Sequence, residues 1–224
     1  PPEDMWKLTQ SPQNAPNEPE KISIEFTKGI PTRLTVHATG NVYTDACDLF
    51  LQLNTLARKH GIGRVDIVEN RFIGVKSRGC YESPGATILR AAHIDLEGVT
   101  LDREVRRIRD QIVTTKLSEI LYYGFFFSPE SQYVRSCIPP SQLTVNGTVK
   151  LSLFKGHVSI DGRSSDELLY DEKFSSMDEL GGFEPEETSG FIAVQSIRLK
   201  RFGLGQSVKG LAGTDPKKAY AIPQ

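Results

Sequence analysis

The sequence predicts an α+β fold, in which a mainly antiparallel sheet packs against helices. Two segments, 21–36 and 148–160, alternate apolar with polar side chains and each contains a Lys-Gly turn, which is typical of β-hairpins. Between and after these segments, apolar residues recur at helical spacing in stretches of uneven length. Hairpins interspersed with unevenly spaced helices indicate the α+β class. The sequence contains no internal repeat of the kind that would indicate a solenoid or a propeller.

The first predicted elements are a hairpin, a helix and a short strand. Alternation over 21–26 places three apolar side chains on one face, Lys28-Gly29 supplies the turn, and 30–36 supplies the return strand. From Thr44 the apolar period becomes that of a helix, which we expect to end where Gly61 takes the position after the last turn. A short strand then follows over 64–68.

Helices dominate the middle of the chain. Ser83-Pro84 is a typical N-cap and first-turn pair for a helix with apolar residues on its inner face. Thr100 begins a second helix with acidic residues in its first turn, and 116–123 either continues it or forms a short neighbour. Ser128-Pro129-Glu130 begins another short helix, which we expect Pro139-Pro140 to stop.

The last predicted elements are the second hairpin and a C-terminal helix. Thr188-Ser189 can cap this helix, and its apolar residues are expected to face inward: Phe191, Val194, Ile197 and Phe202. The same stripe also suits an oligomerisation helix or arm that reaches another subunit. The pattern alone leaves core packing and subunit contact equally open.

The composition excludes several classes of protein. The 224 residues carry 27 basic and 28 acidic side chains, and a net charge of −1 gives no overall field for nucleic acid or an anionic membrane. The longest apolar stretch, 120–127, is far shorter than the ~20 residues of a spanning helix. Three cysteines without a CxxC pair and four scattered histidines favour neither a disulfide framework nor a metal site. Residues 1–6 lack the features of a signal peptide, so we expect a cytoplasmic protein without nucleic-acid or membrane partners.

One charged, glycine-rich segment is a candidate binding site. Residues 61–85 contain four basic and three acidic side chains, several glycines and Tyr81. An acidic side chain can bind an ammonium group, a basic side chain or a backbone N–H can bind a carboxylate, and a phenol can add a hydrogen bond. The mixture therefore suits a zwitterionic small molecule. The alternative is a solvated hairpin whose charges pair with one another.

The sequence of this segment resembles a known family. Residues 61–85 (GIGRVDIVENRFIGVKSRGCYESPG) closely resemble the core signature of the argininosuccinate synthases. Further similar segments follow the family's order, so the resemblance runs almost continuously from about residue 5 to residue 202: 22–31 (ISIEFTKGIP), 93–105, 123–130, 147–151 and 189–200.

The resemblance implies an ATP-dependent carbon–nitrogen ligase of arginine biosynthesis or the urea cycle. In this family the ureido oxygen of citrulline attacks the α-phosphorus of ATP, giving citrullyl-AMP and pyrophosphate. The aspartate amine then displaces AMP to give argininosuccinate. The resemblance implies two citrulline-binding residues here: Glu69 as partner of the α-ammonium, and Tyr81 as hydrogen-bonding partner of the amino-acid end. Both would place the substrate rather than react with it, and no catalytic, cofactor-binding or metal-binding residue is implied.

The resemblance also implies a domain that this sequence lacks. Family members begin with a nucleotide-binding domain whose SGGxDTS-type loop binds the pyrophosphate of ATP, with Mg²⁺, and no such motif occurs here. We therefore expect the carboxy-terminal part of the enzyme: a linker or lead-in over 1–20, a synthetase domain over 21–202 and a flexible basic tail over 203–224. The implied partners are citrulline, the N-terminal nucleotide-binding domain and further copies in a homo-oligomer, a tetramer. Alone, the chain should neither bind ATP nor turn over.

The match is not uniform, and an alternative function stays open. Arg90-Ala91-Ala92-His93 stands where family members commonly have Tyr-His-Ala-His, and the segment beyond Phe202 does not match closely. The apolar C-terminal helix and the basic residues from Arg198 onward also suit a non-catalytic assembly or oligomerisation module. A nucleotide-binding loop encoded upstream would favour the ligase over that module.

Overall fold

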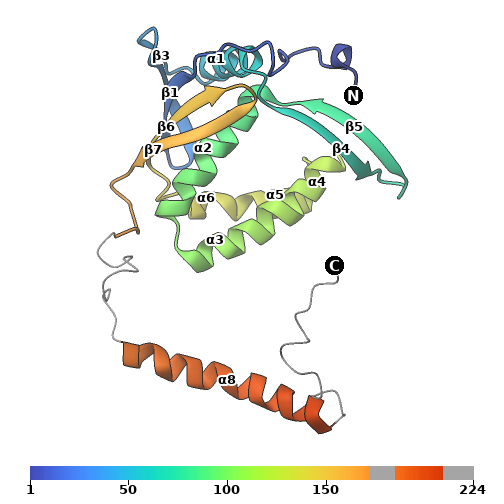
Figure 1. Ribbon diagram of the computed structural model, residues 1–224, viewed down its shortest axis with the longest axis vertical. Coiled ribbons are helices and arrows are strands. Elements are labelled where there is room, and N and C mark those ends of the chain that lie inside the picture. Colours follow the sequence, from blue (N-terminus) through green and yellow to red (C-terminus); the bar gives the residue numbers. More distant parts are fainter. Residues whose placement is uncertain (172–184, 209–224) are drawn as a thin grey trace, which may run out of the picture. The chain divides into compact units, whose positions relative to one another are not determined.

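A computed structural model of the chain describes residues 1–171 and 185–208 (Figure 1). The chain divides into two units, Pro1–Tyr170 and Asp171–Gln224, which are described separately. The α+β class is confirmed by the order of elements in the described residues: η1 (a 3₁₀ turn, Glu3–Met5), β1 (Glu20–Thr27), β2 (Ile30–Val36), β3 (Asn41–Tyr43), α1 (Ala46–Lys59), β4 (Arg64–Asn70), β5 (Lys76–Glu82), α2 (Pro84–Thr100), α3 (Arg103–Asp110), η2 (a π-helical segment, Gln111–Leu117), α4 (Ser118–Tyr122), α5 (Pro129–Ser136), α6 (Ile138–Ser141), β6 (Gly147–Phe154), β7 (His157–Ser164) and α8 (Pro185–Val208).

Both predicted hairpins are present and pair with each other in one antiparallel sheet. The strand order is β3-β2-β1-β6-β7, and Ile22 of β1 pairs with Leu151 of β6. Each hairpin turns through Lys-Gly with positive φ at both positions, at Lys28-Gly29 and again at Lys155-Gly156. Two consecutive positive φ angles define the turn whose twist matches paired strands, which explains the tight connections.

The hydrophobic core lies between this sheet and the helices α1 and α2, and α2 crosses behind β6 and β7 (Figure 1). Asp45 caps α1 by accepting hydrogen bonds from the backbone N–H groups of Cys47 and Asp48. The core side chains contributed by the sheet and by the two helices are almost fully buried: Ile22, Ile24, Leu34, Val149, Leu151, Leu49, Leu53, Ile88 and Leu96. This core fixes both ends of the segment that carries the candidate site, because α1 precedes that segment and α2 follows it.

The candidate segment itself forms a second, two-stranded sheet. Strands β4 and β5 pair antiparallel and extend away from the five-stranded sheet as a ribbon (Figure 1). Apolar side chains on the ribbon remain exposed, including Val65, Ile67 and Val68. An isolated two-stranded ribbon is marginally stable in water. Its stability therefore depends on contacts at its base and at its tip.

At the base, the segment predicted as a linker or lead-in is packed against the ribbon. The carboxylate of Glu82, at the end of β5, accepts hydrogen bonds of 2.7–3.1 Å from the backbone N–H groups of Lys7, Leu8 and Thr9. The guanidinium of Arg64, at the start of β4, donates to Glu3 and to Thr9. Residues 1–20 therefore belong to the same compact unit as the sheet. The proline content of residues 1–20 does not predict this packing, because the hydrogen-bond partners on the ribbon lie more than 50 residues away in the sequence.

Stability should depend on the charge of Glu82 at low pH. Burial alone would raise the pKa of Glu82, but the Thr9 hydroxyl and the three backbone N–H groups outweigh burial and lower it to about 2. The folded state thus binds this proton more weakly than the unfolded chain. The contribution, about 2 kcal/mol after allowance for solvent screening, is fully present above about pH 4.5 and lost as the pH falls through 2. In urea unfolding, Glu82→Gln should have a lower free energy of unfolding than the unsubstituted chain at pH 6. The two free energies should differ little at pH 2. A difference independent of pH, or an equal one in the exposed control Glu18→Gln, would contradict this assignment.

The helices after α2 differ from the prediction in two respects. Asp102 caps α3, and 103–122 runs on through the π-helical segment η2 into α4, so 116–123 continues the second helix. The first difference is that Thr100, predicted to begin the second helix, is the last residue of α2, and α3 begins at Arg103. The second concerns Pro139 and Pro140, which lie inside the one-turn helix α6 instead of stopping α5, which already ends at Ser136. Proline is tolerated in a first turn, where its missing N–H has no intrahelical partner.

The C-terminal unit contains one described helix. Helix α8 begins at Pro185, before the expected cap at Thr188-Ser189, and it spans the boundary predicted at 202/203. The prediction that its apolar residues face inward is wrong for this unit: the side chains of Phe191, Val194, Ile197 and Phe202 are 64–66% exposed. Most of the predicted basic tail, 209–224, lies outside the described residues.

Candidate functional site

The register of the ribbon sorts its side chains onto two faces. Val65 pairs with Tyr81, Ile67 with Gly79, and Glu69 with Ser77. Because successive side chains of a strand point to opposite faces, these six share one face. Asp66, Arg78 and Cys80 belong to the other face. The two residues predicted to bind the ligand thus lie on the same side of the ribbon.

Glu69 and Tyr81 are in direct contact. The phenol of Tyr81 donates a hydrogen bond to Oε1 of Glu69, although the two residues are not opposite one another in the register. The Glu69 side chain is only 16% exposed, whereas Tyr81 is 43% exposed. The hydrogen bond to Glu69, burial and the negative charge of Glu69 all raise the pKa of Tyr81. The phenol therefore stays protonated at neutral pH and remains a hydrogen-bond donor.

The second carboxylate oxygen of Glu69 is free to bind a ligand. Oε1 carries the Tyr81 bond, and Nη1 of Arg71 lies 4.0 Å from the same oxygen. Within 1–171 and 185–208, Oε2 has no hydrogen-bond partner. A partly buried carboxylate with one open oxygen can bind an ammonium group through charge-assisted hydrogen bonds. The adjacent guanidinium of Arg71 supplies the opposite charge that a zwitterionic ligand also requires.

The opposite face of the ribbon matches the alternative prediction, in which charges pair with one another. Arg78 makes a two-point contact with Asp66, with Nε and Nη2 at 2.8 and 2.6 Å from the two carboxylate oxygens. The hydrogen bond and the charge of Arg78 lower the pKa of Asp66, and Asp66 in turn raises the pKa of Arg78. Both carboxylate oxygens of Asp66 are therefore occupied by the guanidinium of Arg78. The candidate site is therefore confined to the Glu69 face.

Helix α4 holds the tip of the ribbon. The hydroxyl of Tyr122 donates a 2.9 Å hydrogen bond to the carbonyl of Asn70, the residue next to Glu69. Tyr123 packs edge-on against Phe72, with ring centroids 4.8 Å apart. These aromatic residues line a cavity of about 350 Å³ together with Arg71 and Phe125. Sequence analysis missed this anchor, because the partners are some 50 residues apart and an exposed tyrosine carries no local signal.

Removing the Tyr122 hydroxyl should loosen the ribbon without unfolding the protein. The hydrogen bond to Asn70 contributes about 1 kcal/mol, so Tyr122→Phe should speed amide hydrogen exchange over 66–80 about fivefold and leave α1 and α2 unchanged. The matched control is Tyr133→Phe, since Tyr133 is 74% exposed. Unchanged exchange in the ribbon of Tyr122→Phe would mean that this bond does not hold the tip.

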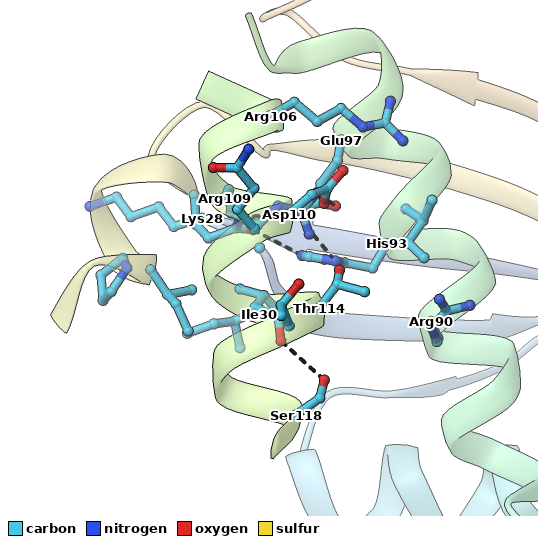
Figure 2. Close-up of a pocket in the computed structure, with 18 residues that line it drawn as sticks. Lys28, Ile30, Arg90, His93, Glu97, Arg106, Arg109, Asp110, Thr114 and Ser118 are labelled. Atoms are coloured by element: carbon cyan, nitrogen blue, oxygen red, sulfur yellow. Dashed lines mark hydrogen bonds and ion pairs between the residues drawn. The ribbon is translucent and has the colours of Figure 1, made fainter. Parts of the chain in front are cut away.

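A second cavity, of about 960 Å³, lies between α2, α3, η2 and the β1–β2 turn (Figure 2). One ion pair in its lining joins α3 to α2. Figure 2 shows Arg109 of α3 directed at Glu97 of α2, which is fully buried. The guanidinium of Arg106 lies against Gly98 instead of pointing to a common centre with Arg109. The cavity therefore does not gather its cations around one ligand position.

Among the residues that the structure describes, no group of three or more His, Cys, Asp or Glu side chains is arranged to hold a metal ion. No described helix has both the length and the apolar character needed to cross a membrane.

Comparison with known proteins gives consistent matches over most of the chain. Residues 1–202 match the family model described as arginosuccinate synthase C-terminal domain. The chain is 56% identical to argininosuccinate synthase of Schizosaccharomyces pombe over 207 residues, which cover 92% of this chain and 50% of the relative. It is 52% identical to the Saccharomyces cerevisiae protein of that name over 217 residues, covering 94% and 51%, and 50% identical to the Bos taurus protein over 201 residues, covering 90% and 48%. The chain thus spans about half the length of the curated relatives it matches.

Proposed function

Because this chain belongs to the family of arginosuccinate synthase C-terminal domains, we propose that it forms the citrulline-binding part of an ATP-dependent ligase that makes argininosuccinate. The observation that carries the proposal is the contact between Glu69 and Tyr81 on one face of the ribbon. This contact and the family resemblance support the same two side chains.

In this proposal, the two residues bind the amino-acid end of citrulline. The open oxygen of Glu69 accepts hydrogen bonds from the α-ammonium group. The hydroxyl of Tyr81 donates a hydrogen bond to the Glu69 carboxylate, and its oxygen accepts a hydrogen bond from the same amino-acid end of citrulline. The ureido group then extends away from the ribbon toward ATP. Orienting a weakly nucleophilic neutral oxygen in line with phosphorus can supply several kcal/mol, within the roughly 7–11 kcal/mol known for well-oriented groups. Neither residue exchanges protons or forms a bond with substrate.

ATP with Mg²⁺ and aspartate are assigned to a nucleotide-binding domain corresponding to the other half of the relatives. Exposed apolar side chains support a partner on the ribbon: Val68, Phe72 and Ile73 are 64, 71 and 80% exposed. Apolar surface of this kind marks interaction sites. On this basis the chain alone binds no ATP and is inactive, and the assembled enzyme works in the cytoplasm.

A second candidate function is a non-catalytic assembly module. The exposed apolar residues of α8 support it, since an apolar helix surface favours contact with further subunits. The two functions are compatible within one homo-oligomer, with a tetramer as our expectation. They differ in whether the chain contributes to turnover.

A chimera tests the proposed function. This chain would replace the matching half of the S. cerevisiae enzyme, to which it is 52% identical. We expect argininosuccinate, AMP and pyrophosphate to form from citrulline, aspartate and ATP, and none to form with this chain alone. A chimera that assembles but does not turn over, while the parent enzyme does, would favour the assembly module. Turnover by this chain alone would contradict the division of roles.

A further inference from the structure

The backbone conformation at Gly79, a residue of the ribbon, does not require glycine. Gly79 lies in the middle of β5, opposite Ile67, and its φ is not in the left-handed region that favours glycine. Glycine in the interior of a strand lowers stability, because it contributes no side chain to packing and loses the most conformational freedom. In such positions it often marks the close approach of another group. Here the approaching group is a side chain of the candidate site.

The ring of Tyr81 lies directly over Gly79. A Cβ atom at residue 79 would come within 2.4 Å of Cε2, 2.6 Å of Cζ and 2.6 Å of the hydroxyl oxygen of Tyr81. The ring therefore runs back along the strand instead of standing perpendicular to it. Only this direction brings the phenol toward Glu69, whose strand partner is Ser77, two residues before Gly79.

We infer that Gly79 is a positioning residue for citrulline binding, because the absence of a side chain at residue 79 lets the Tyr81 ring lie along the ribbon and hydrogen-bond to Glu69. The identity of the ligand in this inference rests on the proposed function, whereas the contact between Gly79 and the Tyr81 ring does not. A methyl group at this position would displace the far end of a rotatable side chain and leave the backbone in place. The fold should therefore survive while the Glu69–Tyr81 pair separates.

The chain offers a matched control for the added methyl group. Gly162 also lies in a strand, β7, and a Cβ atom there would meet nothing within 4 Å. Gly162→Ala thus reproduces the loss of a strand glycine without a neighbouring ring. The substitution Gly79→Ala and this control should have similar unfolding midpoints.

The test is a double-mutant cycle in the chimera, with the KM for citrulline and the KM for ATP as readouts. Gly79→Ala should raise the KM for citrulline about tenfold or more and change the KM for ATP less than about twofold. Combined with Tyr81→Ala, which removes the ring, Gly79→Ala should have no further effect. An effect of Gly79→Ala that is equally large without the ring, or no effect in its presence, would overturn the inference.

A spectroscopic measurement on the chain itself separates this inference from the proposed function. Ultraviolet titration of the phenols, with Tyr81→Phe as the reference, isolates the ionisation of Tyr81. In Gly79→Ala this ionisation should move to lower pH, toward that of a free tyrosine, because the hydrogen bond to Glu69 that raises the pKa is lost. An inactive chimera combined with this shift would refute the proposed function and leave the positioning role intact. An unchanged Tyr81 titration would refute the positioning role.

Discussion

Replacing Glu69 by glutamine in the chimera is expected to raise the KM for citrulline about 100-fold and to leave the KM for ATP nearly unchanged. The reason is that the amide retains the size of the side chain but removes the charge that pairs with the α-ammonium group. A charge-assisted hydrogen bond in a largely shielded position contributes about 1.5–3 kcal/mol, and tenfold corresponds to 1.4 kcal/mol. Glu69 qualifies because its side chain is only 16% exposed. Steady-state kinetics, with citrulline and ATP varied in turn, measure the two KM values.

The control for this prediction is on the other face of the same ribbon. Asp66→Asn makes the same carboxylate-to-amide change, but Asp66 is already paired with Arg78 and faces away from Glu69. Its effect on the KM for citrulline should stay below about threefold. Equal increases in the KM for citrulline and for ATP in Glu69→Gln, or equal effects of the two substitutions, would show that Glu69 supports the ribbon rather than the ligand.

The second large effect is expected on stability, from Glu97→Ala. Glu97 is fully buried, bonds to the guanidinium of Arg109 and accepts a 2.9 Å hydrogen bond from Nε2 of Gln142. Its removal would leave the Arg109 side chain, only 11% exposed, with the half-exposed Asp110 carboxylate, 3.3 Å from Nη2, as its remaining acidic partner among the described residues. Breaking a buried pair in this way typically costs about 3–5 kcal/mol. That is a large share of the roughly 5–15 kcal/mol by which domains are stable.

Urea denaturation measures this effect against two comparisons. Glu104→Ala removes an exposed carboxylate that pairs with Arg103 and Arg107, and it should change the free energy of unfolding far less than Glu97→Ala does. The double substitution Glu97→Leu with Arg109→Met removes both charges and should recover much of the loss. A loss below about 1 kcal/mol in Glu97→Ala would mean that the buried pair does not hold α3 against α2.

Regular alternation explains why the sheet was predictable. In β1 and β6, apolar residues at every second position both predict strands and form the buried face, as at Ile22, Ile24 and Leu151. The Lys-Gly turns also follow from local chemistry, since glycine adopts positive φ without steric strain. Elements whose stability depends on neighbours in sequence were therefore predicted well.

The contacts that build the site depend on long-range partners, and sequence reasoning missed most of them. Nothing local links Tyr122 to Asn70 or residues 7–9 to Glu82. The apolar residues of α8 were predicted to pack inward, although their side chains are exposed in their own unit. One contact in the site is local and did have a usable signal: Gly79 lies two residues before Tyr81 on the same strand, and same-face neighbours of a strand have this spacing. The family resemblance, rather than the composition, selected Glu69 and Tyr81 from the charged segment.

A comparison of two ligands tests most directly whether the carboxylate of Glu69 binds the α-ammonium group of citrulline. The second ligand is δ-ureidovalerate, which is citrulline with hydrogen in place of the α-amino group. In calorimetric titrations of the chimera, citrulline should bind about 100-fold more tightly than this analogue, and Glu69→Gln should abolish the preference by weakening citrulline alone. If the variant keeps the preference for citrulline, or loses affinity for both ligands equally, then the ammonium group is bound elsewhere.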